Sequence, residues 1–171
     1  CGGSSDPPER FALSDYADCL AGLIRTLDLD RPHVVGLSFG GALALELFRR
    51  YPAIPRSLVI AGGYAGWSGS LPAADVTQRI ERLYHDLELP AEQWIPMYLP
   101  GMLAESTPAT TVREAFDLMH AVHPAGNRTM LAALAHGPIL TTLLLAAATG
   151  ASAAFIAAVL ASVSGSACAP R

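Results

Sequence analysis

The chain contains no lysine and little charge of either sign. Its 11 basic residues are all arginine, and 15 acidic residues bring the formal net charge to −4. Because no basic stripe is present, the chain is not expected to bind nucleic acid. Charged residues make up only 15% of the 171 positions and hydrophobic residues 51%, which excludes intrinsic disorder. The 15 glycines and 13 prolines exclude a long coiled coil.

Cysteine is also scarce. Cys1, Cys19 and Cys168 are too few and too scattered for a disulfide framework, and no pair has a spacing typical of metal ligands. We therefore expect reduced thiols in a cytoplasmic protein, with no metal and no other cofactor. No charged segment followed by an apolar run opens the chain, so no secretory signal is predicted. Since the first residue is cysteine, we expect the N-terminus to be incomplete.

Helical and strand-like patterns alternate in residues 1–66. The predicted elements are, in order, a loop at 1–10, a helix that Ser14 caps and that ends near Pro32, a buried strand at 34–37, a helix at 42–50 and a second buried strand at 57–61. Strands separated by a helix with short connections are typical of a parallel sheet. The pattern predicts an α/β fold for this part.

From residue 73 to about residue 134 the sequence contains no strand-like run. Helical spacing recurs between proline or glycine breaks in four segments, at 75–87, 91–98, 109–120 and 128–134. An all-helical block after an α/β block predicts a separate cap over 67–136.

The last part of the chain, residues 137–171, is apolar and rich in alanine. Residues 139–163 contain no charged side chain, and their length makes them a transmembrane candidate. Alanine dominates, threonine and glycine interrupt the run, and no lysine or arginine flanks it, which favours a buried strand at 142–146 followed by an apolar helix. A third interpretation is that this part is not native coding sequence.

One motif carries chemistry. Residues 36–40 read G-L-S-F-G, which matches G-x-S-x-G, with a strand pattern before it and a helix pattern after it. In that setting Ser38 lies on a sharp, strained turn that exposes its hydroxyl, and it is the predicted nucleophile. The start of the helix carries partial positive charge, so the backbone N–H of Phe39 is the predicted oxyanion donor. Small residues that let strand and helix approach closely are Gly36, Gly40 and Gly41.

With this motif the chain resembles α/β-hydrolases of the esterase, enol-lactonase and prolyl-aminopeptidase-like group. Gly2-Gly3-Ser4-Ser5-Asp6 is similar to the family's G-x-G-x-S loop, with one residue's difference in spacing. The R-R-Y-P sequence at 49–52, where the helix at 42–50 ends, and the S-L-V-I-A-G-G sequence at 57–63 also fit. The resemblance covers about residues 1–136. It implies a partial hydrolase sheet with a helical cap, and a small ester or lactone as the substrate of Ser38.

The chain departs from the family pattern at both ends. The strands and the His-Gly oxyanion loop that precede the G-x-G-x-S loop in the family are not found. Residues 141–152 resemble the strand before the catalytic acid, but no carboxylate and no histidine follow it. The acid and base therefore have no matching residue, and we expect a fragment with weak or no activity. A catalytically dead scaffold and a protein anchored in a membrane through 139–163 are the alternatives.

Other candidate residues have ordinary structural explanations. His33 on the first strand is expected to be structural, and packing or solvation accounts for the remaining histidines, His85, His120, His123 and His136. Capping and solvation account for the carboxylates around the first helix, Asp15, Asp18, Asp28 and Asp30. Five side chains are expected either to line an apolar substrate cleft or to pack the cap: Trp67, Trp94, Tyr98, Phe116 and Met119.

Overall fold

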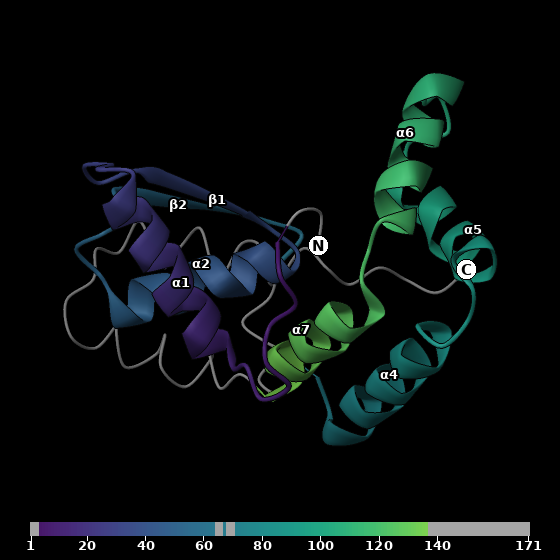
Figure 1. Cartoon of the computed structure of the whole chain (residues 1–171), viewed down its shortest axis with the longest axis horizontal. Coiled ribbons are helices and arrows are strands. Elements are labelled where there is room, and N and C mark those ends of the chain that lie inside the picture. Colours follow the sequence, from purple (N-terminus) through teal and green to yellow (C-terminus); the bar gives the residue numbers. More distant parts are fainter. Residues whose placement is uncertain (1–3, 64–66, 68–70, 137–171) are drawn as a thin grey trace.

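The computed structural model describes residues 4–63, 67 and 71–136 (Figure 1). Its elements are α1 (Leu13–Thr26), β1 (His33–Leu37), α2 (Phe39–Arg50), β2 (Ser57–Ala61), α4 (Ala73–Asp86), α5 (Ala91–Met102), α6 (Ala109–His120) and α7 (Pro124–His136). The strand expected at 142–146 and the apolar run at 139–163 lie outside the described residues.

Helix α1 begins one residue before its predicted cap, so the prediction for Ser14 was wrong. The residue before the helix is Ala12, and its backbone N–H donates a 2.8 Å hydrogen bond to the Asp15 carboxylate. A carboxylate in the first turn can reach back to this N–H, whereas Ser14 already lies inside the helix. The buried stripe of α1 consists of Leu13, Ala17, Ala21 and Ile24.

Strands β1 and β2 form a parallel pair in which Val35 is the register partner of Val59. The inward side chains Val34, Leu58 and Ile60 pack against the buried residues of α1 and α2. Helix α2 lies between the sheet and α1 (Figure 1), which is why its side chains Leu45 and Leu47 are almost completely buried.

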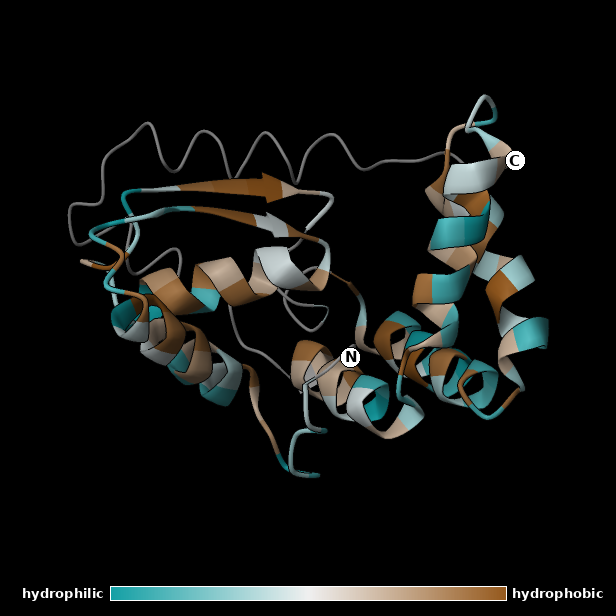
Figure 2. Ribbon diagram, turned by 45° about the horizontal axis from the view of Figure 1, so that its top comes forward, coloured by the Kyte–Doolittle hydropathy of each residue, from teal (hydrophilic) through white to brown (hydrophobic). Residues whose placement is uncertain are grey.

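The opposite face of the sheet is exposed, although both strands were predicted to be buried. Val35, Leu37 and Val59 point away from α1 and α2 and remain open to solvent. Figure 2 shows the hydrophobic strands with α1 and α2 on one side of them. A continuous apolar run predicts burial on both faces, but among the described residues only one face is covered.

The helical block was predicted correctly as all-helical, although several boundaries differ. Helix α5 continues to Met102 through Pro96 and Pro100, beyond the expected end at residue 98. Helix α7 begins at Pro124, four residues before the expected start. Proline suits the first position of a helix, because its missing N–H would have no intrahelical partner there.

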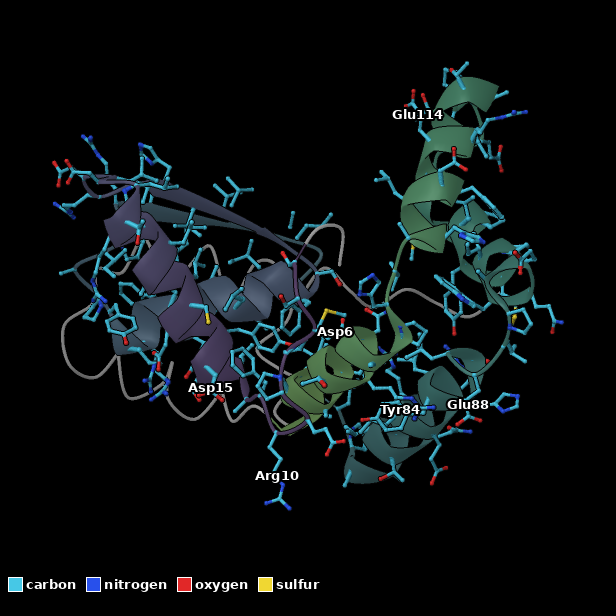
Figure 3. The ribbon with its side chains drawn as sticks, viewed as in Figure 1. Asp6, Arg10, Asp15, Tyr84, Glu88 and Glu114 are labelled. Atoms are coloured by element: carbon cyan, nitrogen blue, oxygen red, sulfur yellow. The ribbon has the colours of Figure 1, made fainter. Side chains whose placement is uncertain are left out.

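Helices α4 and α7 anchor this block to the sheet-bearing part. Core residues from both parts form one buried cluster of Leu13, Ala42, Leu45, Trp67, Val76, Ala133, Leu134 and Ala135. Arg128 of α7 contacts Glu88 at 2.8 Å, just beyond α4, and its guanidinium lies 5.3 Å from the ring centroid of Tyr84 (Figure 3). Helices α5 and α6 pair with each other and project away from the sheet (Figure 1).

A long-range contact ties the N-terminal loop to the start of α7. The Asp6 carboxylate lies 3.1 Å from Nδ1 of His123. A Cβ atom placed on Gly126 would lie 2.9 Å from the same carboxylate oxygen, so glycine is the residue that fits beside it. The loop is thereby fixed against α7.

Candidate active site

Ser38 occupies the sharp turn between β1 and α2. Its side chain is exposed, and its backbone has φ 52° and ψ −116°, a combination that costs a residue other than glycine about 1–3 kcal/mol. Two backbone hydrogen bonds hold the turn. The Ser38 N–H donates to the Ala61 carbonyl oxygen at 3.0 Å, and the Ser38 carbonyl accepts from the Gly41 N–H at 2.9 Å. The turn is therefore fixed both to β2 and to the first turn of α2.

Only some of the predicted glycines are sterically required. A Cβ atom on Gly36 would lie 2.2 Å from the Gly40 carbonyl oxygen, and one on Gly41 would lie 3.0 Å from Cγ2 of Ile60. A Cβ atom on Gly40 would meet nothing within 4 Å, so the prediction that the missing side chain of Gly40 lets the strand and the helix approach closely was wrong. Gly40 takes part through its backbone, which Gly36 makes room for.

A further glycine supports the turn and was missed in the sequence. A Cβ atom on Gly63, after β2, would lie 3.2 Å from the Ser38 carbonyl oxygen and 2.9 Å from Cγ2 of Ile60. The preceding Gly62 has a φ of 53°, a left-handed conformation that favours glycine. The signal that could have identified Gly62 and Gly63 was their position as a glycine pair directly after the strand pattern at 57–61.

The start of α2 gives the turn an electropositive environment. Phe39 is the first helical residue, and the first N–H groups of a helix have no intrahelical acceptor. Their dipoles add to partial positive charge at this end. The Phe39 ring is held by Tyr16, 5.4 Å away between ring centroids, and Tyr16 also contacts Phe11 at 4.7 Å. Burial raises the pKa of Tyr16.

Three histidines have partners other than Ser38. His33 Nδ1 lies 2.7 Å from Oγ of Ser57, at the end of β1 remote from Ser38. His120 Nε2 lies 3.1 Å from the Glu92 carboxylate, between α6 and α5. His123 contacts the N-terminal loop, as described above. Among the described side chains, no histidine or carboxylate is hydrogen-bonded to the Ser38 hydroxyl.

The five expected cleft residues do not line one common cleft: one lies in the core cluster, and the other four lie on the paired helices α5 and α6. Trp67 is buried in the core cluster, where Arg79 lies 5.5 Å from its ring centroid. Trp94 and Tyr98 form an edge-to-face pair on α5, and the Tyr98 hydroxyl donates a hydrogen bond to the buried Asp86 carboxylate. Burial, followed by this hydrogen bond, raises the pKa of Tyr98.

The other two expected cleft residues belong to α6. Phe116 lines an open groove of about 550 Å³ together with Leu99, Ala109, Val112, Arg113 and Asp117. Met119 is partly buried on the same helix. The structure therefore brings Phe116 together with Leu99 of α5 in this groove, while Trp67 belongs to the core cluster.

Within the described residues, no group of three or more histidine, cysteine, aspartate or glutamate side chains could hold a metal ion. None of the helices in 4–63, 67 and 71–136 is long and apolar enough to cross a membrane.

The sequence matches the model of the alpha/beta hydrolase family over residues 1–168. A putative carbamate hydrolase, RutD, from Pantoea ananatis is 44% identical over 57 residues, which are 33% of this chain and 21% of that protein. A hydrolase from Pseudomonas aeruginosa has a similar structure, with a TM-score of 0.62 and 26% identity over 78% of this chain and 49% of its own. A thermophilic esterase from Thermogutta terrifontis has a TM-score of 0.66 and 20% identity, over 83% of this chain and 53% of its own.

The matched region therefore corresponds to about half of each of these solved structures and about a fifth of the Pantoea protein. Within it, the strand–turn–helix around Ser38, the small parallel sheet and the helical block agree with a partial hydrolase fold that carries a helical cap. The chain belongs to the alpha/beta hydrolase family.

Proposed function

We propose that the chain carries the nucleophile of a serine hydrolase that acts on a small ester or lactone, and that Ser38 is this nucleophile. The observation that carries the proposal is the strained, exposed backbone of Ser38 between β1 and α2. Strain that is held by surrounding hydrogen bonds is typical of functional sites. The substrate class is supported by neighbours of the same fold, which include the Thermogutta esterase and an N-acyl homoserine lactonase, AidH.

The geometry suggests how the reaction would begin. The Ser38 Oγ would attack the substrate carbonyl carbon, and the carbonyl oxygen would become an oxyanion beside the start of α2. The Phe39 N–H is the proposed donor to that oxyanion, supported by the partial positive charge of the helix end. A base would carry the proton lost from Ser38 to the oxygen of the leaving alcohol as the C–O bond breaks; a water molecule would then add to the acyl carbon, release the acid and return a proton to Ser38. The proton of Ser38 needs a base, and we assign that role to no residue.

We therefore expect slow turnover by this chain. Without a hydrogen-bonded base, serine nucleophilicity falls by several orders of magnitude, and the residual rate comes from binding and the oxyanion donors. A catalytically inactive scaffold is the second candidate function. It is favoured by the partners of His33, His120 and His123, which are Ser57, Glu92 and Asp6 and not Ser38.

A fluorophosphonate probe with site mapping by mass spectrometry separates the two candidates. We expect the probe to label Ser38 slowly, Ser38→Ala to abolish the labelling, and Ser57→Ala to leave it unchanged. Ser57 is the matched control because it is also exposed and has a histidine partner. Absence of labelling at Ser38 would favour the inactive scaffold. Hydrolysis of p-nitrophenyl acetate at the rate of ordinary hydrolases, lost in Ser38→Ala, would contradict the expected slow turnover.

A further inference from the structure

Three aromatic side chains form a continuous stack that ends beside Ser38. The aromatic stack consists of Phe11 just before α1, Tyr16 on α1 and Phe39, the first residue of α2. The ring planes of Phe11 and Tyr16 meet at 85° and those of Tyr16 and Phe39 at 79°. Edge-to-face geometry of this kind is attractive beyond the burial of the rings. Because α1 lies beside α2 (Figure 1), Tyr16 joins the segment before α1 to the start of α2.

The peptide group between Ser38 and Phe39 adjoins this stack. In a trans peptide the C=O and the N–H point in opposite directions within one plane, so the direction of the Phe39 N–H follows from that of the Ser38 carbonyl. The Gly41 N–H donates to this carbonyl oxygen at 2.9 Å and so fixes the rotation of the plane. The position of its other end, at the Phe39 Cα, is fixed through the Phe39 side chain, which packs on the buried core cluster. Both attachments are therefore needed to aim the N–H.

The backbone strain at Ser38 works against this arrangement. Its φ of 52° and ψ of −116° form a sparsely populated combination, which persists only when the surroundings over-determine it. Relaxing either angle would shift the start of α2 relative to β1, and Phe39 is the first residue that would move. The aromatic stack opposes this shift, because Tyr16 contacts both the Phe39 ring and the Phe11 ring.

We propose that Tyr16 is a positioning residue for the chemistry of Ser38: its ring, braced by Phe11, holds the Phe39 backbone so that the N–H faces the oxyanion. The inference rests on the proposed function, because it takes Ser38 as the nucleophile. Tyr16 acts on the reaction through Phe39. The aromatic ring carries this effect, so phenylalanine at the same position should supply it.

The rate at which a fluorophosphonate probe labels Ser38 in the full chain tests the proposal. We expect Tyr16→Leu to lower the labelling rate at saturating probe about tenfold and to change the half-saturating concentration less than about twofold, because the N–H stabilises charge that develops only as the bond forms. Tyr16→Phe should keep the parent rate. Tyr84→Leu is the matched control and should also keep it, since Tyr84 is half-buried but packs on Arg128 in the helical block.

The Phe39 amide signal gives a second readout that does not depend on labelling. With ¹⁵N-phenylalanine the chain shows five such residues, and the Phe39 signal is assigned by its loss in Phe39→Leu. It should broaden in Tyr16→Leu, because a loosened peptide group exchanges between orientations in microseconds to milliseconds. It should stay sharp in Tyr16→Phe. Circular dichroism verifies that each variant folds, and Phe11→Leu provides both measurements from the other end of the stack if Tyr16→Leu does not fold.

Failure of the proposed function and failure of this inference give different results. No labelling of Ser38 in the parent chain refutes the proposed function and the positioning role with it. Labelling in the parent at a rate that Tyr16→Leu leaves unchanged, or an unchanged Phe39 signal, refutes the positioning role alone. An equal fall in Tyr16→Phe would assign the effect to the hydroxyl, and an equal fall in Tyr84→Leu would assign it to general loss of stability. Either result overturns the proposal.

Discussion

Substituting Gly36 by alanine should destabilise the chain, because the new methyl group meets backbone atoms. The Cβ atom would lie 2.2 Å from the Gly40 carbonyl oxygen and 2.7 Å from the Gly41 nitrogen, whereas ordinary contacts begin at 3.4 Å. Strand β1 and helix α2 would have to separate by about 1 Å. Overpacking of this kind costs about 1–3 kcal/mol, occasionally more. Since no flexible side chain can give way, we expect a loss of about 3 kcal/mol in the free energy of unfolding.

Two other glycines provide matched controls for this substitution. A Cβ atom on Gly22 in the middle of α1, or on Gly40 in the first turn of α2, would meet nothing within 4 Å. Alanine is the better helix former, so Gly22→Ala should stabilise the chain by up to about 1 kcal/mol. Gly40→Ala should be neutral or slightly stabilising. The same change is thus expected to act with opposite signs at Gly36 and Gly22.

Urea unfolding followed by circular dichroism gives the free energy of each variant. The close approach of β1 and α2 would be refuted if the free energy of unfolding of Gly36→Ala lies within about 0.5 kcal/mol of the parent value, which is the range usual for neutral surface changes. If Gly40→Ala is as destabilising as Gly36→Ala, the distinction between the two glycines of the motif would be refuted.

Three other variants test contacts described above. The hydrogen bond from Arg50 holds the pKa of Asp18 below its usual range, so the ionised carboxylate stabilises the folded chain at neutral pH. This stabilisation is lost as the pH falls through the lowered pKa. In Asp18→Asn, the urea midpoint should therefore fall less across the acid range than in the parent. Tyr98→Phe removes a donor from the buried Asp86 carboxylate and should cost about 1–3 kcal/mol in urea unfolding. Ser38→Gly relieves the positive φ and should be about 1 kcal/mol more stable than Ser38→Ala, with probe labelling abolished in both.

The sequence predicted those helices and strands that depend only on the spacing of apolar residues within a short segment. Helix α6 was expected at 109–120, and the structure has it over Ala109–His120, because apolar spacing alone determines which residues face α5. The start of α7 was misplaced because Pro124 was taken as a break, although proline is also a favourable first helical residue. The local pattern cannot distinguish these two roles of proline.

Contacts between distant residues could not be predicted in this way. Asp18 was assigned to capping or solvation, but it accepts hydrogen bonds from Arg50 and from the Tyr51 hydroxyl, which follow in another helix and its exit. The motif treated Gly36 and Gly40 alike, and only the crossing of β1 and α2 distinguishes them. The nucleophile role of Ser38 stays a prediction, supported by a turn that the motif had indicated.

The contact between Asp6 and His123 joins positions 117 residues apart and so closes nearly all of the described chain into a loop. The conformational entropy lost in closing so long a loop is recovered only when the enclosed sheet and helices are packed. The contact should therefore form late in folding and open early in unfolding. In a chain cut by a protease at residues 103–108 between α5 and α6, the buried cluster that joins Leu13 and Ala42 to Leu134 would hold the two pieces together, with this contact as a minor addition, so cleavage there need not release the helical block.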